Sequence, residues 1–440
     1  MAWFDICLQR LQCVVRQILP DCAIIKYGYY MSIRHDYPWT RERVLGSSSL
    51  FTIILAICAT LPMSSPGLGF RIPNQDAEAI GRGNAFIATA NNPSAIYYNP
   101  AGISQLKGSY FQYGAHSIVV NSEYKSGAAE FDSEMKIQAV PQVFYTRSIG
   151  QSPFTFGFGI YAPHGLGVEW PGNAPFHDTA HEGKLLFAAV NPVLAYQIGD
   201  QLSIAFGPSF NYSKVKLRQG IAGAPAPGDE FKFIGDDIDY SLHAGVRWQP
   251  HEQWAAGVTY HGPSTMNFHG KSALRPYSPP QGTSVEVDFP QFIMAGLSFR
   301  PTPRWNLEIG VDWTDWDNFN SIVFENTAAG NITVPFNWES SWMYHLGGSY
   351  YFDNPYYVSA GYFLSENSTS TRDFNPIVPD TDLHVMSVGV GYKGKRWTWA
   401  VAAQLIVGPV REVRGATGAG VDGDYQFFNQ AINFSLGYHY

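Results

Sequence analysis

The amino-acid sequence predicts an all-β protein, a 14-stranded antiparallel transmembrane β-barrel plugged by an N-terminal hatch. Three observations lead to this fold class. Most of the chain after residue 107 alternates apolar with polar residues in short runs, as strands do. The connections between these runs are alternately short and long. The segment 67–107 does not alternate, and its many Gly, Ala, Asn and Pro residues cannot form a core without surrounding walls.

The first 66 residues are expected to be an upstream leader and a signal peptide. Arg41 and Arg43 precede a twelve-residue apolar run, Leu50 to Leu61, and small residues follow it. Twelve helical residues cannot cross a bilayer core of roughly 30 Å, so a retained membrane anchor is the weaker interpretation. Met31 is the expected initiator, because the residues before it lie too far upstream of the apolar run.

The composition excludes several classes of protein. All four cysteines lie within the first 58 residues, which suits a chain that crosses an oxidising compartment unfolded. Without the leader's six basic and four acidic residues, the totals of 28 and 36 become 22 and 32. A nucleic-acid partner is not expected, since phosphate binding requires a basic face. No apolar run reaches 18 residues, which excludes helical membrane spans but not membrane-spanning strands.

The clearest predicted strand is Leu202 to Tyr212, where large apolar residues alternate with small or polar ones. A period of two places the two sets on opposite faces, and we expect the apolar set to face lipid. Ile238–Trp248 and Trp305–Thr314 repeat this pattern. Eleven similar runs complete an even number of strands; they begin near Ser109, Ile137, Phe154, Leu186, Trp254, Phe289, Trp342, Tyr356, Leu383, Trp397 and Gln426.

A soluble β-sandwich or propeller would also alternate, so alternation alone does not identify a membrane protein. Large aromatic residues recur at strand ends, as in the interfacial girdles of membrane barrels. They are Trp248, Trp254, Trp305, Trp313, Trp342, Trp397 and Trp399. Tight turns also alternate with long segments, which is typical of periplasmic turns opposite external loops. The long segments are Ala162–Leu185, Lys214–Gly235, Pro263–Asp288, Asp317–Glu339, Ser365–Asp380 and Gly408–Tyr425.

Four short motifs follow one another along the chain. They are Gly69-Phe70, an Ala-x-x-x-Gly-Arg-Gly-x-Ala run at Ala77–Ala85, Asn99-Pro100-Ala101, and Ala162–Gly167 followed by Glu169-Trp170. By these motifs the chain resembles, from about Gly67 to Tyr440, the FadL/TodX family of outer-membrane channels for hydrophobic compounds. His164 departs from the family, which more often has an aromatic residue there. The resemblance implies a hatch at 67–107 and a barrel at 108–440, in the outer membrane of a Gram-negative bacterium.

The resemblance also implies a function: energy-independent diffusion of hydrophobic small molecules, with long-chain fatty acids as the first substrate and aromatic or aliphatic hydrocarbons as the second. In the family the third and fourth external loops capture the ligand, and here these are Lys214–Gly235 and Pro263–Asp288. Their apolar residues Phe231, Phe233, Met266 and Phe268 are candidate substrate contacts. The alternative interpretation is that these residues only pack the loops against each other.

Charged candidates for substrate binding lie at the same end of the barrel. Lys214, Lys216 and Arg218 would bind the carboxylate of a fatty acid, because a carboxylate in a dry pocket needs a cation. For an uncharged hydrocarbon they would be ordinary rim charges. By resemblance, Phe70 and the adjacent Arg71 reach the inner pocket from the hatch.

The resemblance further implies a gate. Asn99, Pro100 and Ala101 of the hatch are expected to lie against a kinked third strand, through which family members release ligand sideways into the membrane. In this chain that strand contains Gly157 and Gly159, which permit a kink and a close approach of the hatch. Room for packing in a narrow lumen is the alternative interpretation of these glycines.

The sequence offers little for catalysis, and no catalytic residue, cofactor or metal is expected. His177 and His181 are four residues apart beside carboxylates, but they lack the His-Glu-x-x-His order and are expected in a solvated loop. Asp312, Asp315 and Asp317 are interpreted as a solvated rim. An outer-membrane lipid-modifying enzyme, the alternative from another class, would need a clustered nucleophile and base that the sequence lacks.

Two other membrane proteins fit less well. A general porin has no need for the hatch, and an energised receptor would have about 22 strands. The chain ends in an alternating run at the aromatic Tyr440, which resembles the signal read by the outer-membrane assembly machinery. The expected partners are therefore a hydrophobic substrate, outer-membrane lipid and this machinery, and the chain is expected to be a monomer.

Overall fold

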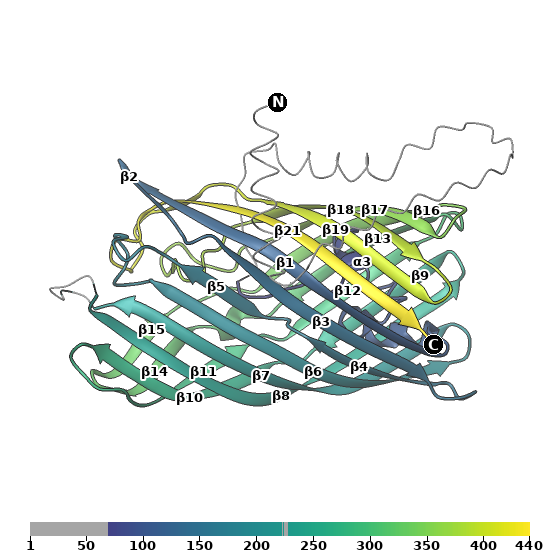
Figure 1. Ribbon diagram of the computed structural model, residues 1–440, viewed down its shortest axis with the longest axis horizontal. Coiled ribbons are helices and arrows are strands. Elements are labelled where there is room, and N and C mark those ends of the chain that lie inside the picture. Colours follow the sequence, from purple (N-terminus) through teal and green to yellow (C-terminus); the bar gives the residue numbers. More distant parts are fainter. Residues whose placement is uncertain (1–68, 222, 224–227) are drawn as a thin grey trace, which may run out of the picture. The chain divides into compact units, whose positions relative to one another are not determined.

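The computed structural model describes residues 69–221, 223 and 228–440. The leader and Met31 lie outside the described residues. Fourteen antiparallel strands form the wall of a barrel, which closes because β1 (Ser109–Ser126) pairs with both β3 (Lys136–Ser148) and β21 (Gly423–His439). The predicted fold class is therefore confirmed (Figure 1).

The remaining wall strands follow one another along the chain, each paired with its neighbours. They are β4 (Phe154–Tyr161), β6 (Glu182–Ile198), β7 (Leu202–Gly220), β8 (Glu230–His251), β9 (Trp254–His261), β12 (Phe292–Phe299), β13 (Trp305–Thr314), β16 (Ser341–Tyr351), β17 (Tyr356–Ser365), β18 (Leu383–Lys393) and β19 (Trp397–Val407). Each of the fourteen predicted runs overlaps or directly precedes one wall strand. The predicted starts were least accurate where strands continue beyond the lipid.

Seven further strands extend the barrel at the end opposite the C-terminus, where β2, β5, β14 and β15 gather in Figure 1. They are β2 (Ala129–Asp132), β5 (Gly165–Glu169), β10 (Ser264–Arg275), β11 (Gln281–Phe289), β14 (Ser321–Thr327), β15 (Gly330–Pro335) and β20 (Arg411–Val413). A short 3-10 helix, η2 (Trp316–Asn318), precedes β14. This end carries the long connections, which identifies it as the external end.

Two of the predicted external loops are mostly strand. β7 continues to Gly220 and β8 starts at Glu230, so the predicted loop Lys214–Gly235 shrinks to a short connection. The predicted loop Pro263–Asp288 is the β10–β11 hairpin. The period of two persists in both segments, but most outward residues become charged or polar instead of apolar. The prediction ended the strands where the apolar face ended.

The two faces of the wall differ as predicted. On β7 the side chains of Phe206 and Phe210 are 54% and 52% exposed, whereas Ala205 and Ser209 are both 6% exposed. The large apolar set therefore faces outward and the small polar set faces the lumen, which is the arrangement of a membrane barrel. No helix among the described residues is long and apolar enough to cross a membrane.

The hatch fills the lumen and is almost completely buried. It contains α3 (Ala77–Ile80), α4 (Ala95–Tyr98) and the 3-10 helix η1 (Pro100–Gln105). α4 and η1 are short turns without apolar periodicity: α4 follows Asn92-Pro93, and η1 starts at Asn99-Pro100, where the Asn99 side chain caps it. The wall has glycines where the hatch backbone approaches most closely: a Cβ on Gly347 would lie 1.9 Å from the carbonyl oxygen of Arg82.

Candidate transport site

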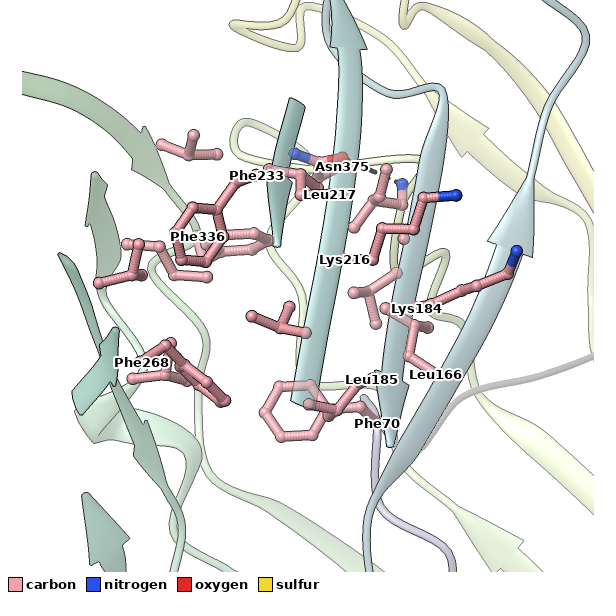
Figure 2. A pocket seen from close by; sticks show the side chains of 18 of the residues that line it. Phe70, Leu166, Lys184, Leu185, Lys216, Leu217, Phe233, Phe268, Phe336 and Asn375 are labelled. Atoms are coloured by element: carbon pink, nitrogen blue, oxygen red, sulfur yellow. Dashed lines mark hydrogen bonds between the residues drawn. The ribbon is translucent and has the colours of Figure 1, made fainter. Parts of the chain in front are cut away.

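An apolar pocket lies at the external end of the lumen, beside the start of the hatch (Figure 2). It encloses about 760 Å³ of empty space, part of it open to solvent. Its lining is mostly apolar, as is usual for small-molecule sites. The side chains labelled in Figure 2 come from the hatch, the barrel wall and the external loops; the apolar ones are Phe70, Leu166, Leu185, Leu217, Phe233, Phe268 and Phe336.

Phe70 of the hatch forms one boundary of this pocket. Its ring centroid lies 4.8 Å from that of Trp316, 5.3 Å from Phe319 and 5.4 Å from Phe289, in edge-on contacts. Such contacts between aromatic rings add about 0.5–1.5 kcal/mol each to the effect of burial. The hatch therefore starts with an aromatic anchor at the pocket, and contact between Phe70 and a ligand stays a prediction.

The candidate residues of the two predicted capture loops divide into two groups. Phe233 and Phe268 line the pocket. Phe231 and Met266 are buried next to it, with the Phe231 ring 5.2 Å from the ring of Phe324. All four face the lumen, because they belong to strands whose lumenal residues recur at every second position. Phe233 and Phe268 therefore form part of the pocket surface, and Phe231 and Met266 pack next to them.

The candidate basic residues do not point into the pocket, which corrects the predicted carboxylate site. Lys214, Lys216 and Arg218 have the same parity on β7 as the lipid-facing Phe210, so they lie on the outer face. Lys184 and Lys216 border the cavity with their aliphatic carbons, and Figure 2 shows both ammonium groups directed away from it. Glu182 binds two of these outward-facing cations: its carboxylate lies 2.6 Å from Lys216 Nζ and 3.1 Å from Arg218.

Arg71 anchors the hatch to β13. Its guanidinium donates two 2.7 Å hydrogen bonds to the two carboxylate oxygens of Asp312 and a 2.6 Å bond to Thr314 Oγ1. It also lies 3.6 Å from the centroid of the Phe292 ring. The rim interpretation of Asp312 is thus wrong, because this carboxylate is buried in the lumen by its pair with Arg71. The charge of Arg71 is therefore already paired without a ligand, although its buried Nε–H has no hydrogen-bond partner among the described residues.

A second anchor lies further down the same strand. The Glu308 carboxylate accepts 2.9 Å hydrogen bonds from the backbone N–H groups of Ala88 and Thr89, and a 2.6 Å bond from Thr89 Oγ1. Arg82 of the hatch lies 3.9 Å from the same carboxylate. Asn306 donates to Thr89 Oγ1 at 2.9 Å. The lumenal face of β13 therefore holds the hatch by buried charged and polar groups at both of its ends.

The wall is interrupted between β3 and β5. β4 ends at Tyr161, and the backbone ladder with β3 stops at the Val143–Ile160 pair. β5 then pairs only with β6. Next to this interruption, Gln138 donates a 2.7 Å hydrogen bond to the carbonyl of Gly167. Toward the external end, Lys136 pairs with Glu169, and Glu134 N–H bonds the Glu169 carbonyl at 2.7 Å. The Gln138 side chain thus spans the part of the interruption that has no backbone hydrogen bonds among the described residues.

The hatch lies directly behind this interruption. Ile72 N–H bonds the carbonyl of Pro163 at 2.7 Å, and Gly165 N–H bonds the carbonyl of Phe70 at 2.8 Å. A second cavity, with about 900 Å³ of empty space, adjoins Ile72, Gln138 and Gly167. Leu166 borders both this cavity and the apolar pocket. The first residues of the hatch and Leu166 therefore separate the pocket from the interruption.

The predicted gate residues lie in two different places. A Cβ on Gly157 would be 2.9 Å from Ile103 Cδ1 and 3.0 Å from Ile96 Cγ1, and a Cβ on Gly159 would be 2.9 Å from Ile96. Hatch side chains thus fill the space that these glycines leave.

The Asn99-Pro100-Ala101 turn lies elsewhere, which corrects its expected place against the third strand. Asn99 Nδ2 donates to the carbonyl of Val246 on β8 at 3.0 Å, and Ser203 of β7 donates to the carbonyl of Ala101 at 3.1 Å. The glycine that leaves room for Pro100 is Gly245 of β8. The Asn99 side chain also accepts a 3.2 Å hydrogen bond from the Ala101 N–H within the same turn. The turn therefore fixes the local shape of the hatch and contacts β7 and β8.

Sequence reasoning missed the aromatic residues of η2 and its surroundings. Trp316 and Trp338 contact Phe70, but Trp338 lies in the predicted loop Asp317–Glu339 and Trp316 directly precedes it. It also missed Gln138, a polar residue in a predicted strand without a motif. The glycine-rich segment Ala162–Gly167 was the only signal in the sequence for the contact of Gln138. A single sequence does not show which strand residues become neighbours of that segment.

The described residues contain no group of three or more potential metal ligands. His177 Nε2 lies 3.0 Å from His181 Nδ1, and the His177 side chain is largely buried, so the predicted solvated loop is wrong for this residue. Gly220 lies against His177 and Asp178, which explains this burial. Asp315 and Asp317 are at least partly exposed near the end of β13, as predicted for a rim.

A closed barrel with an anchored hatch, an apolar external pocket and an interrupted wall defines a class: outer-membrane channels for hydrophobic compounds. The model of the outer membrane protein transport protein family (OMPP1/FadL/TodX) matches residues 56–421, and the chain belongs to this family. The protein is thus an outer-membrane transport channel and not an enzyme.

Individual relatives are distant in sequence. A protein of Neisseria meningitidis serogroup B, whose name places it in the outer membrane, is 22% identical over 401 residues, 78% of this chain and 86% of that protein. The crystal structure of a Pseudomonas aeruginosa FadL homologue has a TM-score of 0.73 at 19% identity and covers 84% of this chain and 99% of its own. The P. putida toluene transporter TodX has a TM-score of 0.63 at 16% identity, over 80% and 98%.

Proposed function

We propose that the channel takes up neutral hydrophobic molecules, aromatic or aliphatic hydrocarbons, through the apolar pocket. The observation that supports this choice is the direction of the cations. Lys184 and Lys216 are the only charged residues that border the pocket among the described residues, and their ammonium groups point away from it. A fatty-acid carboxylate in the pocket would have no cation to pair with, and a dry unpaired charge is costly.

Long-chain fatty acids are the second candidate substrate. The pocket mouth has uncharged hydrogen-bonding groups, including Thr179, Gln219 and Asn375. A fatty acid would fit if its chain lay among the phenylalanines and its carboxylate stayed at this mouth, in water. Its affinity would then depend on chain length and only weakly on the carboxylate, since each buried CH₂ contributes about 0.8 kcal/mol.

The proposed route has three stages. A ligand enters the pocket from outside, where apolar surface replaces water around it. The start of the hatch then shifts, which moves Phe70 and opens the way to the second cavity. The ligand leaves sideways through the interruption between β3 and β5, where the Gln138 side chain bridges the wall and the Lys136–Glu169 ion pair closes its outer end. The close packing of Gly157 and Gly159 against Ile96 and Ile103 supports the hatch beside this route.

Uptake measurements distinguish the substrates. Cells that lack their own channels would receive this protein and be supplied with labelled toluene, hexadecane or oleate. We expect faster uptake of both hydrocarbons and little change for oleate. Rapid oleate uptake with no hydrocarbon uptake would overturn the proposal in favour of the second candidate.

A blocking variant tests the pocket itself. Leu217→Trp adds bulk inside the pocket and should reduce uptake of the transported compound at least tenfold, by filling the space that the ligand needs. Leu242→Trp is the matched control, because Leu242 faces lipid and is 49% exposed. Equal uptake by the two variants would show that ligand does not pass through this pocket.

A further inference from the structure

The outer face of the barrel carries a basic patch at its external end. The patch lies on five neighbouring strands, β5, β6, β7, β8 and β10, whose outward positions are fixed by the strand register. Seven basic residues and four acidic residues belong to it, although the whole chain has a net charge of −8. The basic residues are Lys184, Lys214, Lys216, Arg218, Lys232, Lys271 and Arg275; the acidic residues are Glu169, Glu182, Glu230 and Asp236.

The patch begins where the lipid-facing surface ends. The outward residues of β7 are Phe206, Phe210 and Tyr212, all exposed, and the next outward residue is Lys214. On β8, the outward Ile238 is 72% exposed and lies just below the patch. Apolar exposed side chains mark the hydrocarbon region of the membrane, so the basic patch lies at the level of the outer headgroups.

Like charges face each other across the strands of this patch. Lys184 is directly opposite Lys216 in the β6–β7 register, and Arg218 is directly opposite Lys232 in the β7–β8 register. Like charges in such positions are destabilising. Glu182 and Glu230 offset part of this repulsion: Glu230 lies 2.7 Å from Arg218 and 3.5 Å from Arg275. These carboxylates are already shared among several cations.

Three lysines of the patch have no ion pair within the described part of the chain: Lys214, Lys232 and Lys271. Lys271 and Lys216 lie on either side of Ile234 in the register, and Lys232 is two residues from it on the same face. Burial together with the nearby Arg275 and Lys216 lowers the pKa of Lys232, and the nearby Glu230 offsets only part of this shift. The arrangement surrounds one apolar side chain with three ammonium groups.

We propose that Lys216, Lys232 and Lys271 bind a phosphate of a glycolipid headgroup in the outer leaflet. Ammonium groups are strong phosphate ligands, and basic clusters at the edge of a membrane span bind anionic lipid headgroups. Ile234, 36% exposed between the lysines, contacts the lipid's acyl region. The apolar surface directly below favours a lipid over a free phosphate ion, because only a lipid has acyl chains that can contact this surface.

The test measures binding of deep-rough lipopolysaccharide to the folded barrel in detergent micelles, for example by thermophoresis. The test variant is Lys216→Gln/Lys232→Gln/Lys271→Gln. The matched control removes three cations at the other end of the barrel, Arg147→Gln/Lys395→Gln/Arg396→Gln. We expect about a hundredfold weaker binding in the test variant and no change in the control, since each lysine near a charged membrane surface contributes to lipid binding.

A second arm keeps the proposal testable if the variant does not fold. The unaltered barrel is titrated with the same lipopolysaccharide after its phosphates have been removed, and separately with inorganic phosphate. We expect dephosphorylated lipid to bind at least tenfold more weakly and inorganic phosphate not to displace the intact lipid at millimolar concentration. Equal binding of the dephosphorylated lipid would overturn the proposal, and so would displacement by inorganic phosphate.

Discussion

The two walls that hold the hatch use different interactions. On β13, Asp312 and Glu308 bind it through buried charged hydrogen bonds from Arg71 and from the backbone of Ala88 and Thr89. On β4, Gly157 and Gly159 give room for the side chains of Ile96 and Ile103, and the contacts are apolar. Charged hydrogen bonds therefore hold the hatch to β13, whereas complementary side-chain packing holds it against β4.

The difference shows which side can move. Breaking a buried ion pair without a replacement partner costs about 3–5 kcal/mol, whereas apolar contacts can slide with smaller losses. The interruption in the wall adjoins β4 and β5, on the side that lacks charged anchors. We infer that opening occurs when Phe70 and Ile72 shift on this side about the Arg71–Asp312 pair, while Glu308 of β13 keeps the remainder of the hatch in place.

The largest expected effect comes from removing a partner of the β13 anchor. Asp312→Ala leaves the Arg71 guanidinium buried without its carboxylate, and we expect a loss of about 3–5 kcal/mol in the free energy of unfolding. Denaturant unfolding of the barrel in lipid vesicles measures it. Asp353→Ala, in an exposed turn, is the control. Arg71→Met/Asp312→Leu should recover most of the loss, and failure of the single variant to differ from the control would contradict the anchor.

At the second anchor we expect a smaller loss of stability than in Asp312→Ala, because water that enters the lumen can satisfy most of the groups that lose their acceptor. Glu308→Ala leaves two backbone N–H groups and Thr89 without their acceptor, at a cost of about 1–3 kcal/mol for each unsatisfied group that water does not reach. Water that enters the lumen to satisfy them would raise the ion conductance of the channel in planar bilayers. Glu252→Ala, in an exposed periplasmic turn, should leave conductance unchanged. Identical conductance of both variants would exclude Glu308 as an anchor.

The apolar side should respond less. Gly157→Ala places a methyl group 2.8 Å from Val193 and 2.9 Å from Ile103, contacts that flexible side-chain ends can partly relieve. We expect a loss of about 1 kcal/mol in the free energy of unfolding. Adding Ile103→Val should return part of that stability, because it removes the contacting Cδ1 atom. A loss as large as that of Asp312→Ala would remove the contrast between the two walls.

The smallest effect concerns pH and the external ion pairs. Burial alone would raise the pKa of Glu182, but hydrogen bonds from Lys184, Lys216 and Arg218 outweigh it and lower the pKa to about 2. The stabilisation is therefore complete above about pH 4.5 and is lost as the pH falls through about 2. Thermal unfolding from pH 6 to pH 2 should lose this increment, and Glu182→Gln should be less sensitive to acid. An unchanged acid profile in Glu182→Gln would contradict the assignment.

Much of the fold could be predicted because lipid and lumen impose opposite demands on alternate residues. The alternation along β7 also indicates that Lys216 faces outward, because Lys216 lies on the same face of the strand as Phe210. The pairing of Arg71 with Asp312 could not be predicted, because the two residues are 241 positions apart and no local pattern joins them. The contacts of Asn99 were misplaced for the same reason: strand neighbours in the closed barrel decide them.

The most direct test of the account locks the interruption in the wall. Gln138→Cys/Gly167→Cys would join β3 to β5 by a disulfide where the Gln138 side chain now bridges them. Tyr145→Cys/Phe158→Cys is the matched control, since this pair already faces across the intact β3–β4 ladder. If ligand leaves through this interruption, oxidation abolishes uptake of hydrophobic compounds only in the first variant, and a reductant restores it. Full uptake by the oxidised, cross-linked channel would contradict lateral release.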